Sequence, residues 1–167
     1  MPDLLVHGVL GYLIVVLKPT RYLLASIFLL GCIFPDLIRG PALVIANLPY
    51  SMGATIISPD LFIALQVLHS PIPLFFQAWL VCLFFERDIR LRVFVSLLLG
   101  ILLHLILDAG QRVYHTSYLW LFPFSFDNPI AGIWWSDEGN WLTIAAGVIA
   151  GLLLMQRLLN SRTRSAT

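Results

Sequence analysis

Charged residues are scarce in this chain, and this scarcity excludes an ordinary soluble domain. Only 11% of the 167 residues are charged and 59% are hydrophobic, whereas about 25% of residues are charged in a typical soluble domain. The mean hydropathy is +0.90. A water-soluble fold of this length cannot bury so much apolar surface, so the excess is expected to face lipid. The same composition also excludes a disordered chain.

Cysteine and net charge are equally limited. Cys32 and Cys82 are the only cysteines, and they lie in separate apolar runs without C-x-x-C spacing. The sequence therefore predicts two small buried side chains rather than a disulfide framework or a thiolate metal site. The formal net charge is +1, so the dense basic surface that nucleic-acid binding requires is not expected. The first apolar run has neither a basic n-region nor a cleavage site of small residues, and we expect it to be retained.

What the chain does contain is a series of apolar stretches, each predicted to be helical. They are Leu4–Leu17, Tyr22–Ile38, Pro71–Phe85, Val93–Leu107 and Trp141–Met155. Most are shorter than the roughly 20 residues that cross a bilayer, so the bilayer is expected to thin around them or protein to cover their ends. The predicted fold is an all-α, polytopic membrane bundle of about five transmembrane helices. Residues 1–167 are predicted to form a single membrane domain, ending in a short basic tail at 156–167.

Two long connections differ from simple loops. Residues 39–70 are apolar but interrupted by Pro41, Pro49 and Pro59, which predicts interfacial or re-entrant helix pieces. Residues 109–140 are rich in Trp, Tyr, Phe and Pro. Aromatic side chains such as Trp120 and Trp134 are favoured at the level of the lipid head groups, so this segment is predicted to lie there.

The basic residues predict an orientation for these five spans, because Lys and Arg are retained on the cytoplasmic side. Eight of the ten fall on one face of the membrane: Lys18, Arg21, Arg87, Arg90, Arg92, Arg157, Arg162 and Arg164. Arg39 and Arg112 fall on the other face. The C-terminus is therefore predicted to be cytoplasmic and the protein to lie in a cell's inner (cytoplasmic) membrane.

Ionisable residues within the apolar stretches are costly and indicate function. This topology places a group of them at the extracytoplasmic level: His7, Asp36, His69, His104 and Asp108. The sequence HLILD puts His104 and Asp108 four residues apart, on one face of a helix. Such a pair commonly provides two metal ligands, or one ligand and the group that orients it. His115 is near enough in the sequence to be a fourth histidine of this group.

Two explanations of the carboxylates remain open. Asp36 and Asp108 are predicted to lie at helix C-termini, where the helix dipole disfavours an anion, so a cation is expected beside each. Arg39 follows Asp36 by three residues and Arg112 follows Asp108 by four, so ordinary ion pairs would suffice. These pairs leave the histidines unexplained, whereas a divalent metal accounts for both residue types. Nitrogen and oxygen ligands without thiolate favour Zn²⁺, with Mn²⁺ or Fe²⁺ as alternatives.

A set of short motifs resembles one family. In chain order the motifs are HGVLG (7–11), FPD (34–36), LHS (68–70), LLHLILD (102–108) and LFPFS (121–125). Their order is similar to that of the bacterial and archaeal inner-membrane proteins called YdjM-like, or membrane-bound metal-dependent hydrolases. Family members often carry a second aspartate where this chain has Ile38, and an HR pair where it has Ala64–Leu65. The resemblance therefore supports one metal better than two.

The resemblance implies a hydrolase acting on a lipid-like or interfacial ester, more readily a phosphoester, at the extracytoplasmic face. It implies that His7, Asp36, His69, His104 and Asp108 are the metal ligands. Among them we expect His7, His104 and Asp108 to be the first ligands and His69 to be a fourth ligand or a general acid. Asp36 is then a ligand or the base that accepts the proton of water.

Membrane lipid and a phosphorylated or lipid-like substrate are the expected partners, and Arg112 and Arg39 are expected to hold an anionic phosphate. The alternative is a non-enzymatic membrane protein, either a metal-stabilised scaffold or an ion-relaying transporter. Transporters usually have internal repeats. This sequence has no visible repeat, and its polar groups gather at one end. Both features favour a local metal site over a transport pathway through the membrane.

The predicted orientation can be tested with a reporter fused after Thr167. Because eight of the ten basic residues are assigned to the cytoplasmic side, a reporter that works only in the cytoplasm should be active. A C-terminal tag that is accessible from outside intact cells would contradict both this topology and the extracytoplasmic position of the His and Asp residues.

Overall fold

The described part of the chain is all-α. The computed structural model describes residues 4–17, 24–46, 59–110, 118–127, 130, 132–133, 141, 144–145, 147–153 and 155–156. The helices are α1 (Leu4–Leu17), α2 (Ala25–Ala46), α3 (Pro59–Leu68), α4 (Pro71–Cys82) and α5 (Arg87–Ala109). No strand occurs within these described ranges. The prediction of an all-α fold is therefore confirmed.

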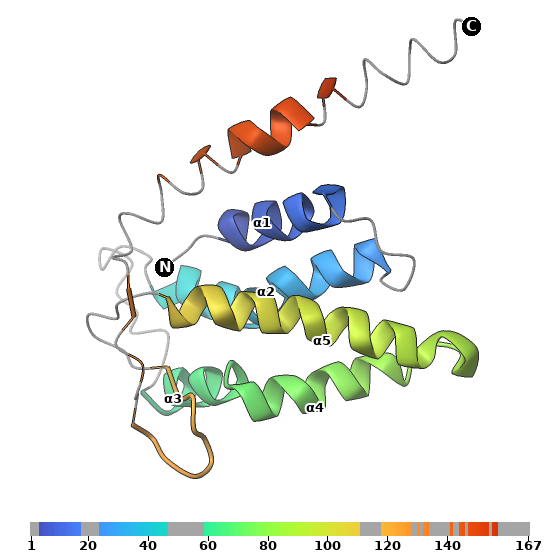
Figure 1. The fold of residues 1–167 in the computed structure, drawn as a ribbon. Helices are drawn as coiled ribbons and strands as arrows, with labels where there is room; N and C mark the ends of the chain where they lie inside the picture. Colours follow the sequence, from blue (N-terminus) through green and yellow to red (C-terminus); the bar gives the residue numbers. More distant parts are fainter. Residues whose placement is uncertain are drawn as a thin grey trace, which may run out of the picture.

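Helix α5 is the centre of the bundle. It packs against α2, α4 and α1, and Figure 1 shows it between the α1–α2 layer and α4. Its buried side chains include Leu97 and Ile101, which form a core with Leu74 and Ala78 of α4. Helix α5 thus contacts three of the other four described helices.

One described helix is long and apolar enough to cross a membrane. This helix is α5, with 23 residues and a mean hydropathy of 2.1 in its most apolar window. Shorter apolar helices are α1, α4 and the first part of α2, Ala25–Ile38. The predicted stretch Trp141–Met155 is described only in part, and its Ala150 packs near Leu13 of α1. The five-span topology thus stays a prediction.

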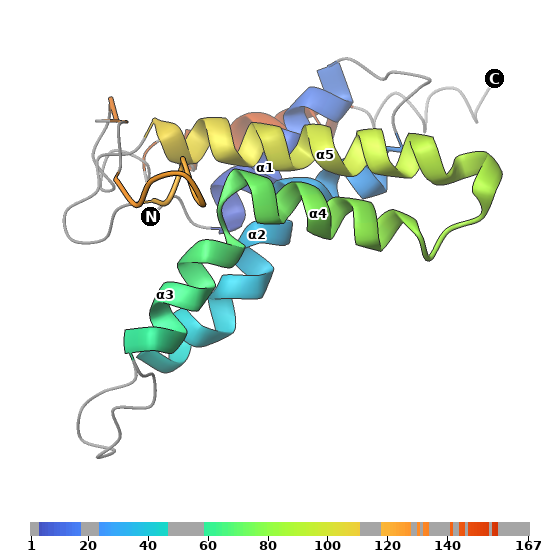
Figure 2. The same ribbon diagram turned by 90° about the horizontal axis from the view of Figure 1, so that it is seen from below.

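Helix α2 is longer than predicted and changes direction. We expected a boundary after Ile38, but α2 continues to Ala46, so Pro41 does not interrupt it. Figure 2 shows the last part of α2 running beside α3, away from α5. Pro35 lies inside the helix, where its missing N–H and its ring disturb the preceding turn. Asp36 directly follows this proline and lies inside α2. The prediction that Asp36 lies at a helix C-terminus, where the helix dipole disfavours an anion, is therefore wrong.

Two glycines allow the backbones of α2 and α5 to touch. A Cβ atom on Gly31 would collide with the carbonyl oxygen of Leu97, and one on Gly100 with the carbonyl oxygen of Phe28. Nearby, the Ser96 hydroxyl accepts a hydrogen bond from the Leu24 N–H at 3.0 Å. Small residues permit such a close approach because they have little or no side chain between the helices.

This crossing predicts a stability loss for Gly100→Ala. The added methyl group has no space, and overpacking typically costs about 1 to 3 kcal/mol. Melting in detergent should therefore occur at a lower temperature than for the wild type. Gly151→Ala is a matched control in a helix, because a Cβ atom there meets nothing within 4 Å. Equal melting temperatures of the two variants would contradict the close crossing.

Candidate metal centre

The predicted histidines and aspartates converge at one end of α5. His7 comes from α1, Asp36 from α2, His69 from the turn between α3 and α4, and His104 and Asp108 from α5. We call these five residues the His/Asp cluster. The three imidazoles and Asp108 are at most 4% exposed, whereas the Asp36 side chain is 19% exposed. The cluster is thus buried, and Asp36 is its most accessible member.

Asp108 contacts all three imidazoles. Its Oδ2 atom lies 2.9 Å from His69 Nε2 and 3.2 Å from His104 Nε2. Its Oδ1 atom lies 3.5 Å from His7 Nε2. The spacing of four residues in α5 produces the contact with His104, as predicted. The contacts with His7 and His69 require three different segments to meet, so Asp108 is the centre of the cluster.

Asp36 lies on the other side of His7. Its Oδ2 atom is 3.5 Å from His7 Nδ1, and its Oδ1 atom is 3.8 Å from His104 Nε2. His7 is therefore placed between two carboxylates, one facing each ring nitrogen. Because Asp36 is partly exposed, it is the carboxylate that a water molecule or a substrate reaches from outside.

A backbone hydrogen bond fixes the orientation of His104. Its Nδ1 atom is 2.9 Å from the carbonyl oxygen of Cys32. A carbonyl only accepts, so Nδ1 carries the hydrogen, and in the neutral imidazole it is the lone pair of Nε2 that faces the cluster. Pro35 has no N–H to donate to the carbonyl of Gly31, the neighbour of Cys32, so the helical bonding of this turn is disturbed. Such support by a carbonyl is typical of a metal-binding histidine.

Several nitrogen atoms of the cluster have no hydrogen-bond partner. The Nδ1 atom of His69 is buried without a hydrogen bond, and both ring nitrogens of His7 have only the 3.5 Å contacts with Asp36 and Asp108, which are too long for good hydrogen bonds. A buried polar group without a partner costs about 1 to 3 kcal/mol. In addition, the Nε2 atoms of His104 and His69 face each other at 3.4 Å. Nitrogens without hydrogen bonds beside two carboxylates are what a bound cation would satisfy.

Two groups of these residues have donor atoms close enough to share a metal ion. His7, Asp36 and His104 form one group, and His69, His104 and Asp108 form the other, with the donor atoms of each within 4.8 Å of one another. His104 belongs to both groups, but its Nδ1 is committed to Cys32 and only Nε2 is available. An imidazole nitrogen has one lone pair, so His104 can bind only one ion at a time. The donor set fits a divalent metal.

The imidazoles continue into a column of rings. The His7 and His104 rings stack with centroids 3.9 Å apart, and His69 meets His104 edge-on at 5.1 Å. The Tyr118 ring stacks on His69 at 5.8 Å, and Trp120 follows at 5.6 Å from Tyr118. Tyr118 was not predicted to be near the site, and Trp120 was assigned to the membrane interface. The sequence signal that could have placed Tyr118 and Trp120 near the cluster was their position just before the LFPFS motif (121–125).

The positions of the other predicted residues can now be compared. We expected His69 at the edge of the group, but it makes the shortest contact with Asp108. Asp108 does lie in the last turn of α5, as expected. The side chain of Arg39, and the whole of Arg112 and His115, lie outside the described residues. The predicted ion pairs between arginine and aspartate are thus not tested.

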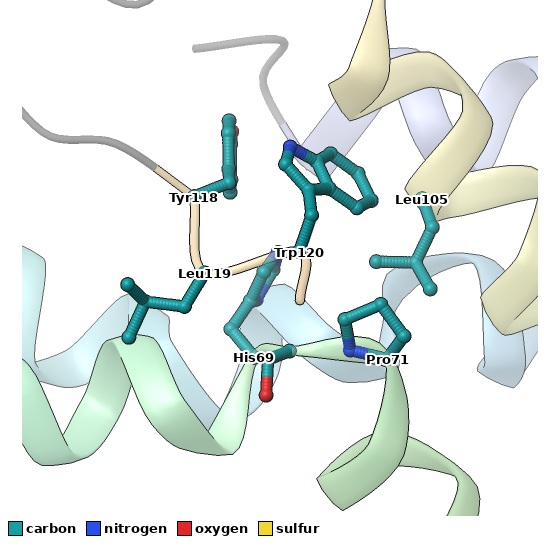
Figure 3. A pocket seen from close by; sticks show the side chains of 7 residues that line it. His69, Pro71, Leu105, Tyr118, Leu119 and Trp120 are labelled. Carbon is teal, nitrogen blue, oxygen red and sulfur yellow. The ribbon is translucent and has the colours of Figure 1, made fainter. Parts of the chain in front are cut away.

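A narrow pocket adjoins the cluster at His69. Its walls come from the α3–α4 turn, from α5 and from residues 118–120. Figure 3 shows Leu105, Tyr118, Leu119 and Trp120 around this space, with His69 and Pro71 beside them. One wall of the pocket is therefore a member of the cluster.

Comparisons of the chain with protein-family models, with curated proteins and with solved structures found no match.

Proposed function

We propose that this chain is a metal-dependent membrane hydrolase related to the YdjM-like proteins, with the His/Asp cluster as its metal centre. The observation that carries the proposal is the convergence of three imidazoles and two carboxylates from four separate segments. The absence of hydrogen bonds at the His69 Nδ1 atom and at both ring nitrogens of His7 supports it, because a purely structural cluster would be expected to form them.

The donor set supports zinc as the metal, with Mn²⁺ or Fe²⁺ as alternatives, because it combines imidazole nitrogens and carboxylate oxygens without thiolate. When bound, such an ion supplies a Lewis acid and lowers the pKa of a water molecule to near neutrality. His7, His104 and Asp108 are the first ligands expected from the sequence, whereas the donor atoms of His104 and Asp108 lie together with that of His69. His69 is a fourth ligand or a general acid, and its contact with Asp108 favours the role of ligand.

Asp36 is the proposed proton acceptor. It is the most exposed member of the cluster, and its carboxylate oxygens lie 3.5 and 3.8 Å from the nearest imidazole nitrogens. A carboxylate held near the metal ligands but reachable from outside is suited to take the proton of water. Arg39 and Arg112 remain the residues proposed to hold an anionic phosphate.

We also propose that the protein spans an inner membrane several times, with the cluster on the extracytoplasmic side. Helix α5 supports this orientation, because Arg87, Arg90 and Arg92 lie at its N-terminal end and His104 and Asp108 at its C-terminal end. Basic residues are retained on the cytoplasmic side. The exposed apolar side chains of the bundle, such as Phe76, Trp79 and Ile106, are then in contact with lipid.

The metal centre predicts that His104→Ala and Asp108→Asn each remove bound metal and any hydrolytic activity. Both residues provide a ligand from one helix face. Loss of a hydrogen bond that supports a ligand lowers metal affinity by roughly 10- to 100-fold, so loss of a ligand itself should lower it further. Elemental analysis of purified protein and release of 4-nitrophenolate from a phosphodiester measure the two effects. Arg112→Gln should retain the metal but bind an anionic substrate more weakly.

Asp127→Asn provides a matched control, since Asp127 is exposed and outside the cluster. It should retain both metal and activity. Full metal content in His104→Ala would reject the ligand assignment.

Removal of the metal should also lower the stability of the protein. A metal that binds the folded state adds about 2.7 kcal/mol when it is present at 100 times its Kd. Treatment with a chelator should therefore lower the melting temperature in detergent, and added Zn²⁺ should restore it. If Arg112 is instead the partner of Asp108, chelation changes nothing and Arg112→Gln destabilises the protein as much as Asp108→Asn.

A metal-stabilised scaffold remains the second candidate, because burial of the cluster by itself explains a stabilising ion. In a scaffold, zinc would raise the melting temperature, but the zinc-loaded protein would hydrolyse no ester. The combination of melting and hydrolysis measurements therefore separates the two functions.

A further inference from the structure

The two groups of candidate ligands in the His/Asp cluster compete for one atom. His104 Nε2 belongs to both groups, because the Nδ1 atom of the same ring donates to the Cys32 carbonyl oxygen. A neutral imidazole has a single nitrogen lone pair to give to a metal. The orientation of the other two imidazole rings relative to His104 therefore decides which group can hold an ion.

The His7 ring is oriented against sharing an ion with His104. The two rings stack, with centroids 3.9 Å apart and planes inclined by only 24°. The lone pair of an imidazole nitrogen lies in the plane of its ring, so an ion bound by two imidazoles must lie in both planes. Two nearly parallel planes do not meet within the roughly 2.0 to 2.1 Å of a Zn–N bond. His7 and His104 therefore cannot both bind one ion in this arrangement.

The His69 ring, in contrast, is oriented as a second ligand would be. Its plane is inclined by 64° to that of His104, and the centroids are 5.1 Å apart. With Zn–N bonds of about 2.0 to 2.1 Å, two imidazoles on a tetrahedral zinc have centroids about 5 Å apart and nitrogens about 3.3 Å apart. The Nε2 atoms of His69 and His104 are 3.4 Å apart. This pair of rings meets both requirements.

Asp108 completes a set of three donor atoms. Its Oδ2 atom lies 2.9 Å from His69 Nε2 and 3.2 Å from His104 Nε2. Each side of the resulting triangle is close to the separation of about 3.3 Å between two ligands of a tetrahedral zinc. Three protein ligands leave the fourth position of such an ion to water or substrate, as in catalytic zinc sites.

We infer that His69, His104 and Asp108 hold the ion, and that His7 is a positioning residue and not a ligand. His7 Nε2 faces Asp108 Oδ1 at 3.5 Å, which is the carboxylate oxygen turned away from the other two imidazoles. His7 Nδ1 faces Asp36 Oδ2 at 3.5 Å. His7 thus lies between the ligand carboxylate and the proposed proton acceptor, and it holds Asp108 with Oδ2 towards the ion.

The inference rests on the metal centre of the proposed function and specifies its ligands, but it does not require hydrolysis. It also changes the set expected from the sequence, because His69 replaces His7 among the first three ligands. Asp36 lies outside this set, with its Oδ1 atom 3.8 Å from His104 Nε2. It therefore keeps the role of proton acceptor and is not a ligand.

Zn²⁺ affinity of the detergent-purified protein, measured by competition with a chromophoric chelator, tests the ligand set. His69→Ala and His7→Ala are a matched pair, because each removes an imidazole that is at most 4% exposed. His69→Ala should weaken Zn²⁺ by more than 100-fold. His7→Ala should weaken it by only about 10- to 100-fold, as expected for a group that orients a ligand. His7→Gln, which keeps a polar side chain beside Asp108, should recover part of this loss.

Proton NMR of the Co²⁺-loaded protein tests the same assignment even if His69→Ala does not fold. Each imidazole bound to Co²⁺ gives a strongly shifted signal from the N–H of its other ring nitrogen. The wild type should show two such signals, from His69 and His104, and His7→Ala should retain both. A third signal that disappears in His7→Ala would show that His7 is a ligand and would overturn the inference.

The outcomes separate this inference from the proposed function. If the wild type binds neither Zn²⁺ nor Co²⁺, the metal centre is wrong and the ligand set with it. If the wild type binds Zn²⁺ but His7→Ala and His69→Ala weaken it equally, the ligand set alone is wrong. If zinc-loaded wild type releases no 4-nitrophenolate from a phosphodiester while the affinities and signals are as expected, the hydrolase function is wrong and the ligand set is supported.

Discussion

The close crossing of α2 and α5 is the contact on which the other features of the site depend. Gly31 and Gly100 bring the two backbones together, and this approach places the Cys32 carbonyl within 2.9 Å of His104 Nδ1. The hydrogen bond then fixes which imidazole nitrogen faces Asp108. A wider crossing would leave His104 free to rotate, and the helix face that carries His104 and Asp108 would no longer present a defined pair of donors.

The composition of the cluster follows from the cost of burying charge. Two carboxylates are gathered with three imidazoles, and Asp108 is almost completely buried. Isolated charges are expensive inside a protein or a bilayer unless they are paired or bind a cation. Nitrogens of His7 and His69 without hydrogen bonds show that hydrogen bonding within the cluster is incomplete. The same cost explains why the cluster lies at one end of α5 and why the partly exposed Asp36 is the member suited to exchange protons.

Much of the fold and the site could be predicted from the sequence. Composition and apolar stretches predicted an all-α fold, and four of the five stretches correspond to α1, α2, α4 and α5. The spacing in HLILD placed His104 and Asp108 on one helix face, because the helical period is a local property. Counting apolar stretches put His7, Asp36 and His69 at the same level. This reasoning needs only the order of helices and not their packing.

Other features were decided by the tertiary structure. The sequence could not show that His69 is central, that Gly100 faces Gly31, or that Tyr118 and Trp120 form a wall beside the cluster. The sequence analysis also predicted that α2 ends at Ile38, whereas it continues to Ala46. A proline inside a helix either bends the helix or terminates it, and the packing around it decides which. The sequence by itself thus determined the helical segments and the gathering of the polar groups at one end of the bundle, because both follow from local periodicity and from the cost of burying charge. Only the packing of distant segments decided which atoms meet, because contacts across 35 or 72 residues depend on how whole helices fit together.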